Sequence, residues 1–586
     1  MGVKGLNKFI TRFEKGIIDH IYMEEEIENW KIDHNGKVPQ ILIDLKEMVH
    51  IFVQRDEIGV ILGGRFDYYN KMLKQFLEKL TKTKAKLVFF MAGKKYTDDL
   101  QFFIPKRESD YMNCLEILNK MELKSDLKAY LDQKNKYSTD IRMALAFDFN
   151  LKKLVRRFGD FHVNYVRHNQ EIAKYAKQHA DEVLAVITND TDFMAFEGEF
   201  QYWRANGINY KELTCFRYCK HKLHDKLGLN FYQMQLLSAL CGSNFLPFYV
   251  IHDWINSLIE SNDNPQQRGK INNVALYVKR QPIELVKNKP TFNLDSISRD
   301  VFGEDYTPVQ LNSIANGLAC YDLDLEDEPD PRYSFQKFCK KNDHFMYKLV
   351  ADDIFNIRDI EYIDFRNYRS KSYTELIVPI LMKLCGILLN DNKRQPITRK
   401  ICVKHAHDEP FKVTEETIIY PKMKLPELFD LVFKNKEHQF DKQRWALLEW
   451  ILDLDQGFVK TLVDKKKSYF IATILTLKYL VQNEEFTAKE ANAVLYTEHR
   501  VRNLGQSMKV EYPNTPNADF IRIAHLYVKM YVLISHCLDV CGLHELTDLL
   551  RFDGAIYHKT MEKFEIADEQ QIEVLHSTLE PIFIFT

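Results

Sequence analysis

The N-terminal part of the chain alternates short apolar segments with amphipathic segments, and this alternation limits the possible folds more than any other feature. The apolar segments are QILIDL at 40–45, KLVFFMAG at 86–93, DFHVNYV at 160–166 and VLAVITND at 183–190. Residues 67–80 and 170–180 carry apolar side chains at helical spacing. Continuous apolar strands separated by helices are typical of a mainly parallel sheet with helices on both faces. We therefore predict an α/β fold with a mainly parallel central sheet flanked by helices.

The chain has 586 residues, which is too many for one hydrophobic core. Strand patterns become sparse after about residue 285, and helical patterns dominate instead, as at 445–463 and 520–543. Residues 94–150 are too long for an ordinary crossover and are predicted to form a helical flap. We predict an α/β domain, a connecting segment with an acidic loop and a helical C-terminal domain, at 1–285, 286–331 and 332–586.

The amino-acid composition indicates the compartment in which we expect the protein. Hydrophobic residues make up 45% of the chain and charged residues 28%, the balance of a globular protein in water. No apolar stretch is long enough to span a bilayer, and the N-terminus lacks a secretory segment. The 10 cysteines follow no repeating spacing, as is usual in a reducing compartment. We expect a cytoplasmic or nuclear protein without a membrane partner, and the net charge of −2 neither supports nor excludes nucleic acid.

Acidic side chains stand where the predicted strands end. Asp44 closes the first strand, Asp190 and Asp192 follow the last one, and Glu171 opens a helix. The carboxyl ends of parallel strands meet at one edge of a sheet, so these four carboxylates are expected to converge. Like charges held together are unfavourable unless a cation lies between them, and oxygen ligands suit Mg²⁺ or Mn²⁺. The pattern predicts metal-dependent phosphodiester hydrolysis, with a simple turn capped by one aspartate as the alternative.

Five motifs in order resemble the flap endonuclease superfamily. They are MGVKGL, ILIDL, QEIAKYA, ITNDTDFMAF and LSALCGSN, and they cover about residues 1–285. The chain is more narrowly similar to the asteroid family through GGRFDYY at 63–69 and PILMKLCGILLN at 379–390. The resemblance implies a flap-endonuclease, PIN-like fold and a structure-specific nuclease site. It assigns Asp44 to the first acidic ligand, Glu171 to the second glutamate of an E-x-E pair, and Asp190 and Asp192 to a D-x-D pair.

Three positions depart from the family pattern. Ala92 stands where the second strand should end in aspartate, and Asn169 stands where the first glutamate is expected. Asn244, in CGSN, replaces the last aspartate. Asparagine can offer a cation a neutral oxygen, whereas alanine offers no ligand atom. The departures predict a degenerate site that holds one Mg²⁺ or Mn²⁺ ion or none, with Asn244 as a further ligand beside the four carboxylates.

The resemblance also implies basic residues that position the scissile phosphate. Lys94 and Arg107, in the predicted flap, approximately match them, and Gly2 and Lys4 are expected near the site. Charge alone suffices for such contacts, although solvated side chains on an insertion are the alternative for the flap residues. The family's glycine-rich duplex-binding motif is missing from 244–270. Basic residues nearby are Arg268, Lys270, Lys279 and Arg280.

Cysteine and histidine side chains at 215–224 suggest a possible zinc site. Cys215, Cys219, His221 and His224 lie within ten residues, but four ligands so close in sequence strain a tetrahedral site. We expect a basic helical turn with two buried cysteines there.

We expect an asteroid-like protein that binds nucleic acid or protein partners, with weak or absent cleavage. The alternatives are an active Mg²⁺-dependent endonuclease acting on DNA or RNA, and a protein-binding scaffold in RNA regulation. A protein partner would bind through the helical C-terminal region.

Overall fold

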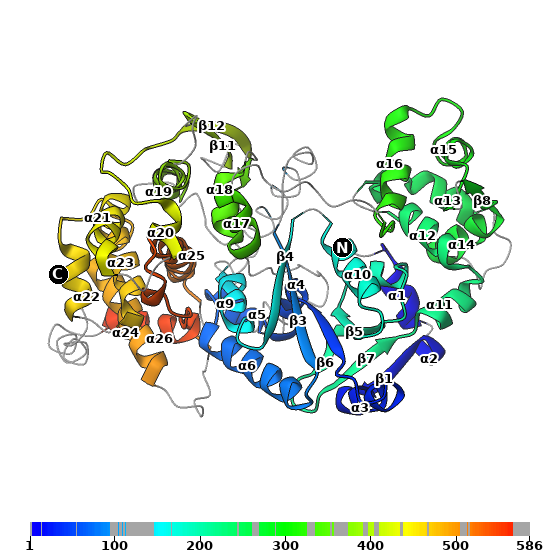
Figure 1. Cartoon of the computed structure of the whole chain (residues 1–586), viewed down its shortest axis with the longest axis horizontal. Helices are drawn as coiled ribbons and strands as arrows, with labels where there is room; N and C mark the ends of the chain where they lie inside the picture. The colour runs from blue at the N-terminus through cyan, green and yellow to red at the C-terminus, as the bar shows by residue number, and fades with distance from the viewer. Residues whose placement is uncertain are drawn as a thin grey trace. The chain divides into compact units, whose positions relative to one another are not determined.

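The fold is seen in a computed structural model of the chain (Figure 1). The residues that it describes are 3–12, 14–53, 56–93, 104, 108, 112, 146–165, 167–242, 245–260, 269–286, 289–324, 334–351, 354–356, 373–390, 396–403, 410–433, 438–465, 468–503, 512–513 and 516–566. They belong to two compact units. Unit 1 comprises Met1–Ile51, Lys74–Lys94 and Val155–Pro329, and unit 2 comprises Phe52–Leu73, Lys95–Leu154 and Asp330–Thr586. The boundaries predicted at 285 and 331 stay predictions, and the predicted flap at 94–150 lies mostly outside the described residues.

Unit 1 is built on a sheet of seven strands in the order β1-β7-β6-β5-β2-β3-β4. The strands are β1 (Ile18–Tyr22), β2 (Gln40–Asp44), β3 (Lys86–Ala92), β4 (Gly159–Asn164), β5 (Val183–Thr188), β6 (Gln201–Asn209) and β7 (Thr214–Tyr218). Neighbours from β6 to β4 pair in parallel, whereas β7 and β1 extend the sheet in antiparallel fashion. The predicted α/β class with a mainly parallel sheet is therefore confirmed.

The central strands have no solvent-facing side. Every residue of β2 and of β5 is buried, which requires cover on both faces of the sheet. The helices of this unit include α1 (Leu6–Arg12), α2 (Glu14–Ile17), α3 (Met23–Asp33), α10 (His168–Gln178), α11 (Lys220–Leu227), α12 (Phe231–Leu240), α13 (His252–Glu260), α14 (Lys270–Arg280), α15 (Leu294–Phe302) and α16 (Pro308–Ala319). A short hairpin joins β8 (Glu284–Val286) to β9 (Lys289–Thr291). Two further helices, α4 (Leu45–Phe52) and α6 (Phe66–Lys82), have residues in both units.

Local sequence explains where several of these helices begin. Asn230 caps α12 and Thr307 caps α16, each in a reciprocal pair with a glutamine three residues later. Pro308 occupies the first turn of α16, where its missing N–H has no partner to lose. The helices α12, α13, α14, α15 and α16 lie together in Figure 1, and α12 packs against both α14 and α16.

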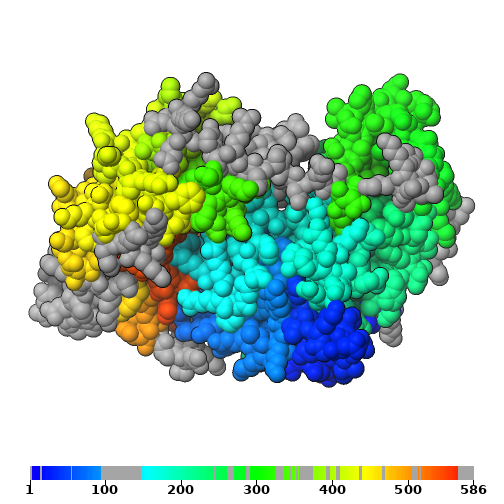
Figure 2. Space-filling view, in the orientation of Figure 1, coloured from blue at the N-terminus to red at the C-terminus, as the bar shows by residue number. Residues whose placement is uncertain are grey.

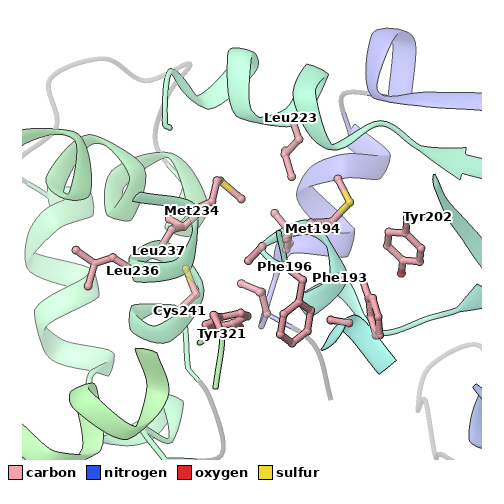
Figure 3. Packing of buried hydrophobic residues seen from close by; sticks show 14 of the residues in the cluster. Phe193, Met194, Phe196, Tyr202, Leu223, Met234, Leu236, Leu237, Cys241 and Tyr321 are labelled. Atoms are coloured by element: carbon pink, nitrogen blue, oxygen red, sulfur yellow. The ribbon is translucent and has the colours of Figure 1, made fainter. Parts of the chain in front are cut away.

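Separate segments of unit 1 share one apolar core. Figure 3 shows Phe193, Met194 and Phe196, from the turn after β5, facing Met234 and Leu237 of α12. The N-terminal helix contributes its own apolar side to the same cluster. On the face shown in Figure 2, the first segment of unit 1, in dark blue, lies beside the last one, in cyan and green.

Unit 2 is mostly helical, as the sequence predicts. Its helices are α5 (Glu57–Ile61), α9 (Ala146–Val155), α17 (Ser334–Asn342), α18 (His344–Val350), α19 (Tyr373–Leu388), α20 (Leu428–Phe433), α21 (Asp441–Leu452), α22 (Phe458–Lys465), α23 (Ser468–Gln482), α24 (Ala488–Asn503), α25 (Ala518–Val540) and α26 (Gly554–Ile566), α9 running one residue into unit 1. A sheet of β10 (Phe355–Asn356), β11 (Thr398–Val403) and β12 (Lys412–Thr417) was not predicted. The helical pattern at 445–463 forms two helices because Asp453 adopts a left-handed φ of 52°.

The expectation that no apolar stretch could span a bilayer was wrong by length and composition, because α25 is the one described helix that is long and apolar enough to cross a membrane. Its apolar window is 83% buried inside the structure, which is the property of a core helix. Leu526, Met530 and Leu538 are among its buried side chains.

A buried polar network ties the GGRFDYY segment into unit 2. The guanidinium of Arg65 contacts Asp553 at 3.1 Å and Asp56 at 3.6 Å, and it donates to the hydroxyl of Tyr512 at 3.2 Å. Tyr69 donates to Asp56 at 3.1 Å. Burial alone would lower the pKa of Arg65, but these acidic neighbours raise it above its ordinary value, so the side chain stays charged.

Candidate functional site

The described part of the acidic site lies where β2 and β5 end. Asp44 is the last residue of β2, and Asp190 follows β5 and caps the short helical turn Thr191–Met194. The buried hydroxyl of Thr188 links the two acids. It donates to Oδ2 of Asp44 at 3.2 Å and accepts from the backbone N–H of Asp190 at 3.1 Å. The parallel sheet thus brings two strand ends that are far apart in sequence to the two sides of one hydroxyl group.

Asp44 has a histidine partner from α10. Its side chain is almost fully buried, and its Oδ1 lies 3.0 Å from Nε2 of His168. Burial alone would raise the pKa of Asp44, but the charge and hydrogen bond of His168 hold it below the ordinary value. The histidine is itself positioned by Asn164, which donates to its backbone carbonyl at 3.3 Å.

Asp190 accepts a hydrogen bond from the residue that stands where a glutamate was expected. Nδ2 of Asn169 donates to Oδ2 of Asp190 at 2.7 Å. The backbone N–H of Asp192 donates to the other carboxylate oxygen at 3.1 Å. Burial raises the pKa of Asp190, whereas the positive charge of the N-terminus and, to a smaller extent, these two donors lower it, and the net pKa lies below the ordinary value.

The pKa of Asp192 is shifted in the opposite direction to that of Asp190. The hydroxyl of Tyr321 donates to its Oδ1 at 2.8 Å. Burial, together with the negative charge of Asp190, raises the pKa of Asp192 well above its ordinary value. The pKa values of the two acids in the D-x-D pair therefore differ, so that Asp190 keeps its charge more readily than Asp192.

The segment that carries Tyr321 follows α16 and is anchored on the start of α10. Arg167 and Gln170 both donate to the backbone carbonyl of Ala319 at 3.4 Å, and Gln170 also donates to that of Asp322. The Tyr321 ring lies 5.2 Å from that of Phe196, and Figure 3 shows the two side by side. These contacts hold the tyrosine hydroxyl against Asp192.

A further acid near the strand ends escaped the sequence reasoning. Glu47 is buried in the first turn of α4, three residues after Asp44, and accepts a hydrogen bond from Asn189 at 2.8 Å. Its spacing from Asp44 was the one available clue. His168 was equally detectable, because it directly precedes the predicted Asn169 position. Tyr321 had no local signal, since it lies 129 residues from Asp192 in sequence.

The remaining predicted residues are placed as follows. Ala92 ends β3 and pairs with Asn164 of β4, so it lies at the same sheet edge without a ligand atom. Glu171 is in the first turn of α10, next to His168 and Asn169, and is half-buried. Lys4 is exposed, with its Nζ 5.7 Å from the ring centre of Phe248. The positions outside the described residues are Gly2, Lys94, Arg107 and Asn244.

The helical turn predicted around Cys215 and Cys219 is wrong in part, because Cys215 lies in β7 and only the residues after Cys219 form the helix α11. Cys219 donates to Asp19 at 3.1 Å, and the ring of His224 lies 3.1 Å from the carbonyl oxygen of Met194. Cys215 is buried within β7, and burial raises the pKa of its thiol. These contacts leave the turn without the inward-facing ligand set that tetrahedral zinc requires.

The described acids differ from the two-ion site that the resemblance implies. Magnesium requires several oxygen ligands in near-octahedral positions. Here each of the three strand-end aspartates already accepts a hydrogen bond from a neighbouring side chain. Within the described ranges, no group of three or more His, Cys, Asp or Glu side chains is arranged to hold a metal ion. These residues therefore do not fit a two-ion site.

Three curated relatives have the same description, "Constitutive coactivator of peroxisome proliferator-activated receptor gamma". The mouse protein is 22% identical over 279 residues, which are 47% of this chain and 34% of that protein. The bovine protein is 22% identical over 42% of this chain and 34% of its own, and the human protein is 22% identical over 46% and 29%. The match thus spans about a third of the length of these relatives. No protein-family profile matches the chain.

Solved structures similar to this chain include nucleases bound to DNA. The catalytic core of Rad2 in complex with a DNA substrate is 13% identical, covers 54% of this chain and 100% of its own, and has a TM-score of 0.27. Human GEN1 in complex with Holliday junction DNA is 15% identical, covers 69% and 84%, and has a TM-score of 0.28. Both TM-scores are low, and the fold described above rests on the strand order of this chain alone.

Proposed function

We propose that this chain is an asteroid-like nucleic-acid-binding protein whose flap-endonuclease-type acidic site is closed by its own side chains, with weak or absent cleavage. The observation that carries the proposal is the set of internal donors at the strand ends. Asp44 accepts from His168, Asp190 accepts from Asn169, and Asp192 accepts from Tyr321. The motif resemblance supports the binding of nucleic acid, in the cytoplasm or the nucleus.

The chemistry of these donors opposes two-ion catalysis. Two divalent ions about 3.5–4 Å apart require concentrated negative charge and free oxygen ligands. Asn169 turns an N–H donor toward Asp190 where a glutamate would add a negative charge. Burial and the negative charge of Asp190 raise the pKa of Asp192 and favour its protonated form, which removes another charge, although the hydrogen bond from Tyr321 acts in the opposite direction. A single Mg²⁺ or Mn²⁺ ion could bind only by displacing such donors, so we expect one weak site or none.

The contacts with nucleic acid are proposed at the four residues predicted from the sequence. Gly2, Lys4, Lys94 and Arg107 would contact the phosphate backbone without reading the sequence. A protein partner for the helical unit 2 is a second proposal, supported by the description of the curated relatives as coactivators.

Two measurements on the full chain test the proposal. Calorimetric titration with Mn²⁺ should give at most one weak site per chain. Flap, single-stranded and duplex substrates should be bound, with little cleavage in Mg²⁺ or Mn²⁺. An Asp44→Asn, Asp190→Asn double variant is the control, because any cleavage that it retains comes from a contaminant.

An active endonuclease and a protein-binding scaffold would each give a different result in these two measurements. Two tight Mn²⁺ sites with rapid flap cleavage, abolished by the double variant, would establish an active endonuclease and overturn the closed-site proposal. Loss of all nucleic-acid binding in the intact chain would leave the protein-scaffold alternative.

A further inference from the structure

An aromatic segment follows α12 on the surface of unit 1. Leu246 and Ile251 are buried and fix its two ends. Between them Tyr249 is 73% exposed and Val250 is 42% exposed. Two adjacent exposed apolar side chains on a segment that is anchored at both ends form a small surface on which a partner can bind.

Two lysines from other parts of unit 1 flank this segment. The ammonium of Lys270 lies 4.2 Å from the ring centre of Phe248, and that of Lys4 lies 5.7 Å from it. Lys270 also donates to the carbonyl of Cys241. No carboxylate among the described residues forms an ion pair with Lys4 or Lys270. Two positive charges at one ring, without an acidic partner there, favour an anionic ligand.

The backbone at Gly242 lets Phe248 and Lys4 approach each other. Gly242 has a φ of +99°, a left-handed conformation that favours glycine. A Cβ at this position would lie 3.3 Å from Cβ of Phe248 and 3.5 Å from Cδ of Lys4. The glycine therefore lets the phenylalanine and the lysine pack against the same turn.

The N-terminal helix that follows Lys4 carries further basic residues. The helix α1 contains no acidic residue in its first turn and ends in Arg12. Lys8 and Arg12 are exposed and four residues apart, so they share one side of the helix. The nearest acid in the aromatic segment's own stretch of chain, Asp253, pairs with His252 at 3.2 Å.

We propose that Lys4, Phe248, Tyr249 and Lys270, the aromatic–lysine surface, bind single-stranded nucleic acid, with a base stacked on Tyr249 and phosphates against the two lysines. The inference rests on the proposed function and names its substrate class. Aromatic stacking requires an unpaired base, whose ring face is accessible only outside a duplex. Lysines supply the accompanying contacts to the backbone phosphates. An apolar protein surface would gain nothing from two unneutralised ammonium groups.

Fluorescence anisotropy on the full chain, with labelled oligo(dT), oligo(U) and a DNA duplex, tests the surface. Tyr249→Ala should weaken binding of the single strands by about 5- to 150-fold, the range expected for one lost stacking partner. Tyr249→Phe keeps the ring and should bind like the wild type. Tyr22→Ala is the matched control, because Tyr22 is a 52% exposed tyrosine elsewhere in unit 1.

The lysines are tested through their salt dependence. Lys4→Gln and Lys270→Gln should each weaken single-strand binding and reduce the slope of log affinity against log salt by about 0.7. Lys37→Gln is the control, since Lys37 is an exposed lysine already paired with Asp181 at 3.1 Å. The two oligonucleotide arms show whether DNA or RNA is preferred.

The outcomes separate this inference from the proposed function. Binding that Tyr249→Ala leaves unchanged, or a loss that is equal for duplex and single strands, overturns the single-strand surface but leaves nucleic-acid binding intact. A wild-type chain that binds none of the three probes overturns both.

Discussion

The side-chain amide of Asn169 donates a hydrogen bond to Oδ2 of Asp190 across 2.7 Å. An amide at this position reverses the polarity that a metal site needs, because a donor replaces a negatively charged acceptor. In the proposed function, this contact is one of the donors that satisfy the strand-end acids. The same contact identifies Asn169→Glu as the substitution that should make the site depend on a metal ion.

Asn169→Glu should make the stability of unit 1 depend on divalent ions. In a chelator, the new carboxylate would face Asp190 without a donor, and we expect a loss of about 1–3 kcal/mol. Millimolar Mn²⁺ should then raise the melting temperature of the variant more than that of the wild type, since a ligand that binds only the folded state stabilises it. Scanning calorimetry in chelator and in Mn²⁺ measures both effects. Asn169→Gln is the neutral control, and equal Mn²⁺ shifts for all three proteins would contradict the prediction.

Tyr321→Phe should destabilise unit 1 by about 1–2 kcal/mol, because Asp192 loses a buried hydrogen-bond donor. Asp192→Asn removes the repulsion by Asp190 and should be neutral or stabilising. The two changes affect the same contact, so their effects should not add. Denaturant unfolding followed by hydrogen exchange at β5 and α10 gives the coupling energy. Purely additive effects would show that the tyrosine and the acid do not interact.

Arg65→Ala should be among the most damaging single changes in unit 2. It would leave Asp553 and Asp56 buried without their common cation, at a cost of about 3–5 kcal/mol. Arg65→Lys keeps the charge but loses the forked geometry, so an intermediate loss is expected. Thermal unfolding of the full chain compares the two variants. Lys71→Ala is the control, since its ion pair with Asp67 is partly exposed and should contribute about 0–1 kcal/mol. A small effect of Arg65→Ala would contradict the structural role of the network.

The stability of unit 2 should fall as the pH drops below about 6.5. Burial lowers the pKa of His525 to about 3, and lowers those of His536 and His558 to about 4. The unfolded chain, with histidine pKa values of about 6.5, therefore takes up protons before the folded one. These groups contribute stability that is complete above pH 6.5 and is lost as the pH falls. Between pH 6.5 and 5.5 the loss is about 1 kcal/mol for each histidine.

Denaturant unfolding across this pH range measures the slope. His525 lies 3.0 Å from the carbonyl oxygen of Ile61, and His525→Gln keeps a donor there without the titrating ring. This variant should lose about a third of the slope. His544, whose pKa is raised by its hydrogen bond to Asp539 despite the opposing effect of burial, changes stability mainly above pH 6.5. A flat profile between pH 5.5 and 6.5 would contradict the neutral, buried state of the three histidines.

The sequence by itself determined the elements that carry the acidic site. Continuous apolar runs predicted β2, β3 and β5 to within a few residues, because strands buried on both faces leave few polar positions, and the edge strand β4 was predicted from its alternating segment at 160–166. Helical spacing predicted α6 and α10 in the same way. The meeting of Asp44 and Asp190 also followed, since parallel strands place their carboxyl ends at one edge. In all these cases the determining pattern is local or follows from a general rule of sheet topology.

Only the tertiary structure decided which groups satisfy the acids. Tyr321 reaches Asp192 across 129 residues of sequence, and Arg65 meets Asp553 across 488. The antiparallel strands β1 and β7 at the sheet edge were equally invisible in the sequence. Propensity and periodicity act over a few residues, whereas these contacts depend on how complete elements pack against one another. Close packing in the interior selects one arrangement, and the partners of a buried charge are fixed only when that arrangement forms.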